Sequence, residues 1–346
     1  FLAIFTAVLA FMALQDAAFV AAEGVFEYPL DDTYIHLAMA EQMVNGTYGV
    51  NAGEAAAASS SPLFSVLLMP FAGDPMQRFI PLLWNSIGLV LAAMLWGRIL
   101  WQSGFGTRFL GLVLAVCGPI SMHMVGVAFL GLEHALHLAV SLAIVSGLLW
   151  FIDTGTLKRW FMLSIFLAPL IRPEGLALAG LAGFAVLISG RFFAGVFLLV
   201  LAVLPLAGFT YWLTMIGLDP VPSSIAAMLA EASATPVLDF AARLQALRQA
   251  VESDVQALIL AALSGMGLLL FGLRSVRRSG RWLVLLVVIA AAVAHLVMGR
   301  FGSMDRYEIY ISASLAAAII AALGVSGSRL IRMLVFVPVL AWGAYY

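Results

Sequence analysis

The sequence has little charge and almost no cysteine. Only 10% of its 346 residues are charged, whereas 64% are hydrophobic and the mean hydropathy is +1.08. A water-soluble domain needs a largely polar surface, so this composition excludes that class and indicates a polytopic membrane protein. The single cysteine, Cys117, lies in an apolar segment. An intrachain disulfide and a metal site built from several thiolates are therefore both excluded.

Two signatures of soluble catalytic sites are also missing. No Gly-rich phosphate loop follows a strand pattern, and no Gly-x-Ser-x-Gly turn occurs. Nucleotide hydrolysis and serine chemistry consequently have no support. The net charge is −1 and the basic residues are scattered rather than gathered into a groove, so we expect no nucleic-acid partner. No internal repeat is evident.

What the sequence does have is a series of apolar segments close to the length that crosses a bilayer. We expect an all-α polytopic membrane protein with about eleven transmembrane helices in a single domain, 1–346. The expected helices are 1–21, 79–97, 109–129, 133–152, 159–171, 175–190, 192–216, 255–273, 282–299, 308–324 and 331–346. The short segments 159–171 and 175–190 are open to two interpretations, as tilted spans or as half-helices that meet at "IRPEG". Because both ends lie in apolar runs, we expect trimmed termini, with a soluble C-terminal domain beyond 346 as an open alternative.

Most basic residues fall on alternate connections between these segments. By the positive-inside rule those connections face the cytoplasm, and the remaining ones face outward. Two long outward loops follow, at 22–78 and 217–254. The basic residues on the cytoplasmic connections are Arg98, Arg108, Lys158, Arg159, Arg191, Arg274, Arg277, Arg278, Arg281, Arg329 and Arg332.

The loop at 22–78 contains two helical patterns of its own. "DDTYIHLAMAEQMVNG" begins with an aspartate at an N-cap position and has apolar residues at helical spacing, which predicts an interfacial helix. "SSSPLFSVLLMPFAG" has a serine cap, Pro62 at the first helical position and too few apolar residues to span, so we expect a second helix along the surface or re-entering it. The second loop becomes amphipathic through "LDFAARLQALRQAVESD".

Asp31 and Asp32 are the most informative polar residues of the first loop. Acidic residues in a first helical turn favour the helix dipole, and one aspartate would suffice for that. Two neighbouring carboxylates at a membrane boundary repel each other and resist desolvation, which suits a general base. Capping and catalysis both remain open at this point.

Charged residues also interrupt the later apolar segments. "IRPEG" places Arg172 and Glu174 beside apolar helices, where an uncompensated charge costs about 2.5–3.5 kcal/mol. They form either an interfacial pair or an arginine aimed at an anionic headgroup. "GRFGSMDRYEIYIS" offers Arg300, Arg306 and Tyr307, either as an interfacial anchor or as part of a site.

"GLEHALH" contains Glu133, His134 and His137, but its spacing matches no zinc protease motif. We expect no metal there and favour an interfacial or structural role. His123 and His295 lie in apolar segments without further ligands, and we expect them to be packing positions.

The first loop resembles that of the GT-C integral-membrane glycosyltransferases, especially bacterial members with a DD-[TA]-[YF]-I stretch. The resemblance rests on "EYPLDDTYIHLAMAEQMVNGTYGVNAGE" followed by "SSSPLFSVLL", with "RPEG" and "DRYEIY" downstream in the same order. It covers roughly residues 24–70 in detail and the rest through topology.

The resemblance implies an inverting transfer of a hexose or pentose from a polyprenyl-phosphate carrier to a glycan, lipid or protein acceptor. The reaction would serve cell-envelope glycan biosynthesis on the outer side of the cytoplasmic membrane. Asp31 would be the base, and the assignment could be exchanged with Asp32 because adjacent carboxylates titrate as a pair. No cofactor is implied, and a divalent metal remains open. The expected substrate-binding residues are His36, Glu133, His134, Arg172, Glu174, Arg300, Arg306 and Tyr307.

Two other classes compete with this interpretation. A transporter or flippase-like binder of a lipid-linked anion also uses intramembrane charges and broken helices. It gives no reason for adjacent aspartates on an outward helix. A noncatalytic membrane scaffold gives no reason for the polar residues at all.

Overall fold

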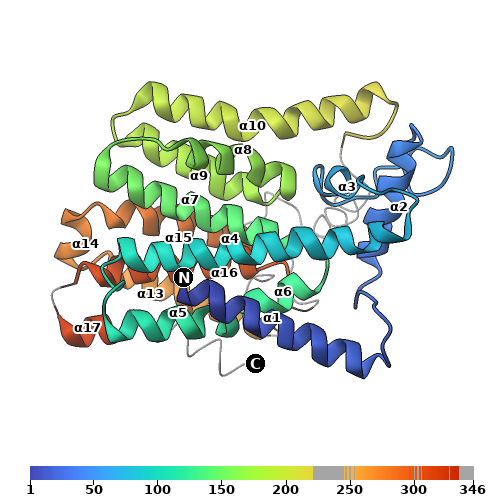
Figure 1. The fold of residues 1–346 in the computed structure, drawn as a ribbon. Helices are drawn as coiled ribbons and strands as arrows, with labels where there is room; N and C mark the ends of the chain where they lie inside the picture. The colour runs from blue at the N-terminus through green and yellow to red at the C-terminus, as the bar shows by residue number, and fades with distance from the viewer. Residues whose placement is uncertain are drawn as a thin grey trace.

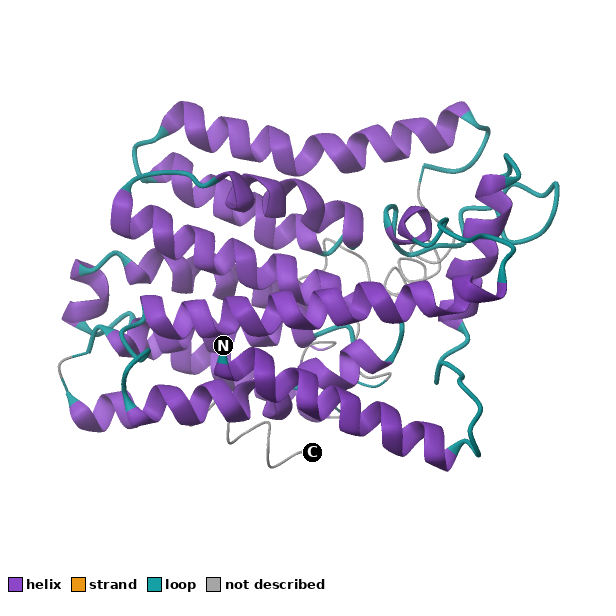
Figure 2. Cartoon of the chain, viewed as in Figure 1, coloured by secondary structure: helices purple, strands orange, loops and turns teal. Residues whose placement is uncertain are grey.

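The computed structural model describes residues 1–220, 245, 248, 251–252, 254–299, 301, 304, 306–326 and 328–334. Every regular element in these ranges is helical, as Figure 2 shows. The α-helices are α1 (Leu2–Ala21), α2 (Asp32–Val44), α3 (Phe64–Leu67), α4 (Ile80–Gln102), α5 (Phe109–Ser121), α6 (Met124–Phe129), α7 (His134–Thr154), α8 (Arg159–Ile171), α9 (Gly175–Ile188), α10 (Phe192–Met215), α13 (Val255–Leu270), α14 (Arg274–Arg278), α15 (Arg281–Met298), α16 (Ile309–Gly324) and α17 (Arg329–Met333). The 3₁₀-helix η1 (Pro75–Phe79) leads directly into α4.

The long apolar helices lie side by side in one bundle (Figure 1). Among the described residues, 5 helical segments are long and apolar enough to cross a membrane: Leu2–Ala21, Pro75–Gln102, His134–Thr154, Phe192–Met215 and Arg281–Met298. Five shorter apolar helices, α5, α8, α9, α13 and α16, accompany them. A helix satisfies its backbone groups internally, which is what a chain in lipid requires. The all-helical fold is thus confirmed for these ranges, and several of its helices could cross a membrane, whereas the expected eleven spans are not confirmed.

The centre of the bundle consists of α7 and α16. All residues from Ile309 to Leu323 are buried, and most of α7 is buried as well. By contrast, α1 and α10 keep large apolar side chains such as Phe5 and Phe197 exposed. Exposed apolar side chains on such a helix suit contact with lipid tails, so α1 and α10 are the peripheral helices.

Small residues allow the central helices to approach closely. A Cβ atom built on Gly88 of α4 would lie only 2.8 Å from the carbonyl carbon of Ala135 in α7. In α16, consecutive alanines at 316–318 are completely buried. Close backbone approach through small residues is a main source of helix association in membranes, where lipid tails are as apolar as leucine.

Two sequence-based expectations need correction. The helix expected at 109–129 is divided into α5 and α6. Helix α5 contains Pro119 near its C-terminal end and stops at Ser121, and His123 adopts a left-handed φ of 55°. A proline removes one backbone hydrogen bond of the helix, and a left-handed residue cannot continue it. The surface helix expected from "SSSPLFSVLL" is only the four residues Phe64–Leu67, and Pro62 precedes it instead of opening it. Serine side chains upstream hold an irregular loop in its place.

Two further expectations fall largely outside the described residues. The amphipathic pattern ending at Asp254 is described only at a few positions, among which Arg248 and Glu252 form an exposed ion pair at 2.7 Å. The last expected span, 331–346, is described only up to residue 334. Within that part, α17 ends at Met333.

The bundle has two chemically different ends. The end on the left of Figure 1 contains four elements that carry the basic clusters. They are the connection between α7 and α8, the first residues of α10, helix α14 and helix α17. We call this the basic end. Helices α2 and α3 lie at the opposite end, which we call the α2 end. The alternation of basic connections is therefore matched by a spatial separation of the two ends.

The two ends predict a membrane topology. With Cys117 replaced by serine, Ala52→Cys at the α2 end and Thr156→Cys at the basic end should react with an impermeant thiol reagent from opposite sides of a sealed membrane. Both positions are exposed, so accessibility does not limit either reaction. Labelling of both from one side would contradict the arrangement.

The close crossing of α4 and α7 predicts a steric sensitivity at Gly88. Gly88→Ala should lower the thermal midpoint of the protein in detergent, because the added Cβ meets the Ala135 backbone. Gly180→Ala is the matched control, since no atom lies within 4 Å of its added Cβ and alanine favours a helix. Equal midpoints for the two variants would show that the crossing tolerates the methyl group.

Candidate functional site

Helix α2 is held at its end of the bundle by two specific contacts. The Thr33 hydroxyl donates to the carbonyl oxygen of Leu130 at 3.0 Å, just before α7. In the preceding linker, the Tyr28 hydroxyl donates to the Arg78 carbonyl at 2.7 Å and accepts from the Leu82 amide at 3.0 Å. These bonds fix the segment that carries both aspartates relative to α4 and α7.

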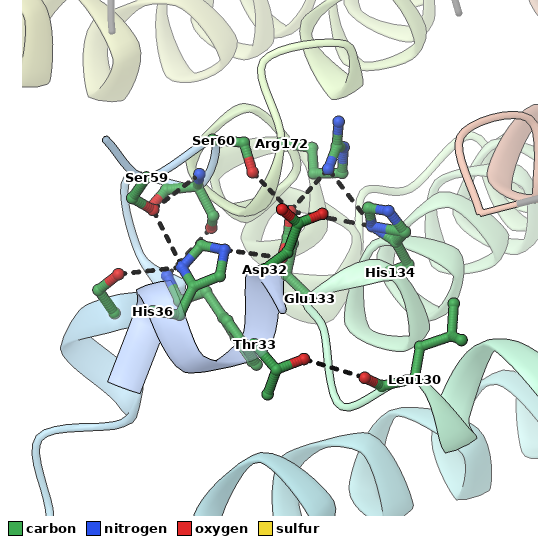
Figure 3. A network of polar contacts seen from close by, with 12 residues as sticks. Asp32, Thr33, His36, Ser59, Ser60, Leu130, Glu133, His134 and Arg172 are labelled. Carbon is green, nitrogen blue, oxygen red and sulfur yellow. Dashed lines mark hydrogen bonds and ion pairs between the residues drawn. The ribbon is translucent and has the colours of Figure 1, made fainter. Parts of the chain in front are cut away.

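His36 brings α2 into contact with Glu133. Its Nε2 atom lies 3.5 Å from Glu133 Oε2, and its Nδ1 atom lies 3.1 Å from the hydroxyls of Ser59 and Ser65 (Figure 3). A hydrogen on Nε2 lets the ring face the carboxylate while Nδ1 accepts from a serine. Burial lowers the pKa of His36, and the Glu133 carboxylate only partly opposes this shift. The imidazole is accordingly neutral at pH 7.

Arg172 lies between two carboxylates in the interior. Its Nη1 atom donates to Glu133 Oε1 at 2.6 Å, while Nη2 and Nε donate to the two oxygens of Glu174 at 2.8 and 3.3 Å. Arg172 is only 4% exposed and Glu133 only 1%. The hydroxyl of Ser60 adds a bond of 3.2 Å to Glu133. A buried charge requires such pairing, and the bidentate contact to Glu174 is the geometry that guanidinium favours.

The local sequence explains why these charges lie between α8 and α9. Pro173 disfavours helical backbone in the residue before it, and Arg172 is extended with φ −149° and ψ 134°. Helix α8 therefore ends at Ile171, and Glu174 becomes the N-cap residue of α9. "IRPEG" is thus a break between two short apolar helices with its charges turned toward Glu133.

A second ion pair joins α2 to the segment before α16. Asp32 Oδ2 lies 2.6 Å from Arg306 Nη1, with 42% of the Asp32 side chain exposed and 8% of Arg306. Arg306 Nη2 also donates to the Tyr307 hydroxyl at 3.0 Å. Asp31 is the exposed N-cap residue of α2, and its side chain makes no capping hydrogen bond.

Tyr307 connects the two groups of charges. The guanidinium carbon of Arg306 lies 4.9 Å from the centre of the Tyr307 ring, and that of Arg172 lies 5.3 Å from it. The ring centre of His134 is 5.7 Å away. Two cations therefore share one aromatic ring, and each is paired with a carboxylate, Arg306 with Asp32 and Arg172 with Glu133. We call Asp32, His36, Glu133, His134, Arg172, Glu174, Arg306 and Tyr307 the charged cluster.

Further histidines line the inner side of the charged cluster. His134 Nδ1 lies 3.4 Å from Arg172 Nη1, and its buried Nε2 has no hydrogen-bond partner among the described residues. One turn later on α7, His137 stacks on Tyr310 with ring centres 4.2 Å apart. The Tyr310 hydroxyl lies 3.4 Å from His295 Nδ1. Within the described ranges, no group of three or more His, Cys, Asp or Glu side chains has an arrangement that could hold a metal ion.

The charged cluster joins residues that are far apart in the sequence. Each sequence-predicted substrate-binding residue belongs to it except Arg300, which lies outside the described residues. Sequence reasoning missed Ser65, which lies in α3, as a cluster contact. It missed Ser59 and Ser60 because "SSSPL" was interpreted as a helix cap. The signal available was three consecutive serines in an apolar chain, which need buried polar partners once the segment packs.

A hollow of about 330 Å³ lies near the C-terminal end of α2. Its lining includes Tyr48, Met69 and Trp212, and the rings of Tyr48 and Trp212 pack edge to face at 4.9 Å. The α2 end thus combines a charged cluster with an aromatic pocket, the two surfaces that a polar ligand with apolar or ring-shaped parts requires.

Comparison of the chain with protein-family models, curated proteins and solved structures finds no match. The geometry of the site therefore carries the functional argument.

The charged cluster predicts a strong dependence of stability on Arg172. Arg172→Met should destabilise the protein by about 3–5 kcal/mol, because Glu133 and Glu174 would remain buried without their cation. Thermal unfolding in detergent measures the loss. Adding Glu133→Gln should restore part of it by removing one uncompensated charge.

Arg248→Met is the matched control for this loss. Arg248 also pairs with a glutamate, but 78% of its side chain is exposed. An exposed pair contributes about 0–1 kcal/mol, so the control should unfold almost as the parent does. Similar midpoints for Arg172→Met and Arg248→Met would contradict the role assigned to the buried pair.

Proposed function

We propose that this protein is an inverting GT-C-type glycosyltransferase that takes a sugar from a polyprenyl-phosphate carrier. The reaction would occur at the α2 end, on the outer face of the cytoplasmic membrane. The proposal combines the motif resemblance of the first loop with the charged cluster. Asp32, Arg172, Arg306 and Tyr307 come from three of the resembling motifs, and they lie together in space.

The observation that carries the proposal is the pair of guanidinium groups on the Tyr307 ring beside the Asp32 carboxylate. Charges at membrane depth are costly and usually mark a functional path or site. A sugar transferase from a lipid phosphate needs both signs close together, a carboxylate for the acceptor and a cation for the leaving group. A scaffold requires neither.

The acceptor side of the reaction falls to the two aspartates. Asp31 is the proposed base, because its carboxylate is exposed and is not used as a helix cap. It would take the proton of the acceptor hydroxyl while that oxygen bonds to the anomeric carbon. Asp32, held by Arg306, would position this end of α2. The bond between the anomeric carbon and the phosphate oxygen breaks, and its electron pair stays on the phosphate oxygen. The configuration at the anomeric carbon inverts.

The leaving phosphate gains negative charge during this step, and Arg306 is the proposed cation beside it. Arg172 is enclosed by Glu133 and Glu174, so its charge is already neutralised. Among the ion pairs of the described residues, Arg306 pairs with Asp32, which is itself partly exposed. For Arg300, a contact to the same phosphate is proposed on the basis of the resemblance alone. Phosphate is a good leaving group, so the proposal requires no protonated acid and no metal.

The remaining cluster residues form the proposed polar wall for the sugar. His36 contacts Glu133, and Arg172 holds both Glu133 and Glu174. His134 Nε2 is a buried polar atom with no described partner, so it could bond a sugar hydroxyl. The aromatic pocket with Tyr48 and Trp212 is the proposed place for a ring or apolar part of a substrate.

The test is sugar transfer by purified protein with a panel of polyprenyl-phosphate sugars, followed as released polyprenyl phosphate. Asp31→Asn should reduce single-turnover transfer by roughly 100-fold or more, because the amide cannot accept a proton. Donor affinity should change little. Asp32→Asn should be the milder change, and Arg306→Gln should weaken donor binding.

Glu23, an exposed acid outside the resembling stretch and the pocket lining, provides the matched control, and Glu23→Gln should transfer sugar at the parental rate. Near-parental transfer by the double variant Asp31→Asn with Asp32→Asn would disprove base catalysis by this pair. Donor binding with no turnover under every condition would instead favour a transporter or flippase-like binder.

A further inference from the structure

A groove whose lining shares no residue with the charged cluster lies between α4, α7 and α8. It has a volume of about 430 Å³ and is lined mainly by apolar residues, including Leu91, Met94, Val140 and Leu163. Leu91, Met94 and Leu163 are exposed, so the groove opens at the lipid-facing surface of the bundle. Arg98 is the cation in its lining. The groove therefore combines an apolar channel with a positive charge.

Arg98 is held in place by a serine and two tryptophans, with no carboxylate partner in the described part of the chain. Its Nε atom donates to the Ser146 hydroxyl at 3.2 Å, and its guanidinium carbon lies 5.0 Å from the Trp160 ring centre and 5.6 Å from that of Trp150. Lys158 Nζ lies 4.4 Å from the same Trp150 ring. No described acidic side chain lies within ion-pair distance of Arg98 or Lys158. Two cations thus share one tryptophan, and no counter-ion for them is found among the described side chains.

The nearby acid on α7 is already engaged. Asp153, close to Trp150 in sequence, pairs with Arg281 at 3.0 Å. The surroundings of Arg98 and Lys158 consequently keep a positive charge that an anion can complement. Tryptophan and basic side chains together are typical of the level of lipid headgroups.

We propose that this groove binds one acyl chain of an anionic phospholipid, with the lipid phosphate at Arg98 and Lys158. Basic pockets between transmembrane helices at the cytoplasmic side are suited to anionic headgroups. From Leu91 to Arg98 the rise of α4 is about 10 Å, less than the thickness of one leaflet and suited to part of an acyl chain. The site lies toward the basic end, whereas the proposed sugar donor binds at the α2 end. The inference is independent of the proposed glycosyltransferase activity.

The experiment is native mass spectrometry of the purified full chain with added phosphatidylglycerol or phosphatidylcholine. Phosphatidylglycerol should be retained in preference to phosphatidylcholine. Arg98→Gln and Lys158→Gln should each weaken its binding about fivefold, the effect of one cation near a lipid surface. Lys158 is exposed, so its replacement leaves the packed interior unchanged. Ala143→Leu, which fills part of the groove, should weaken phosphatidylglycerol binding without changing any charge.

Arg108→Gln is the matched control, because Arg108 lies exposed at the same end and outside the groove. It should bind phosphatidylglycerol as the parent does. An equal loss in Arg108→Gln, or equal retention of phosphatidylcholine, would overturn the site in favour of diffuse attraction. Retention of polyprenyl phosphate instead of phosphatidylglycerol, sensitive to Arg98→Gln, would overturn the assignment to a phospholipid.

Discussion

The neutralisation of Arg172 by Glu133 and Glu174 is the interaction on which the α2 end depends. The three residues come from the start of α7 and from the break between α8 and α9, so their contacts join three helices at one point. Each of the three charges would be strongly destabilising if it were left unpaired in a low-dielectric interior. The ion pairs therefore constrain the relative positions of the three helices. His36 and Ser60 then attach the first loop to the same glutamate.

The packing of the central helices makes this pairing possible. Gly88 brings α4 against the first turn of α7, the turn that follows Glu133 directly. The wholly buried α16 is preceded by Arg306 and Tyr307, so its position in the bundle sets where these two side chains meet α2. Apolar packing and the charged cluster are thus two parts of one arrangement, since small shifts of either helix would separate charges that cannot be left unpaired.

The two ends of the bundle divide their charges in different ways. At the α2 end, carboxylates and guanidinium groups are mixed and mostly buried, which gives a compact site of both signs. At the basic end, Arg98 and Lys158 lie against tryptophan rings. Among the ion pairs described there, Asp153 pairs with Arg281. The first arrangement suits a reaction in which charge moves, and the second suits contact with anionic lipid headgroups.

Particular elements show how far sequence reasoning extended into the structure. Helix α2 was expected from its aspartate at the N-cap position and its apolar spacing, and it begins at Asp32. The break at "IRPEG" was expected because proline and two charges interrupt apolar runs, and α8 ends there. The helix expected at 109–129 was wrong in one respect, since apolar periodicity alone did not show that Pro119 and His123 would divide it.

By itself the sequence determined that the chain is an apolar, helical membrane protein and where its polar residues interrupt that pattern. Hydropathy, proline and charge act locally, so they can be interpreted along the chain. Only the tertiary structure decided that Asp32 pairs with Arg306, that Arg172 is shared by Glu133 and Glu174, and that Ser59, Ser60 and Ser65 reach the cluster. Such pairings depend on how separate helices pack, and short motifs carry no information about the distances between them.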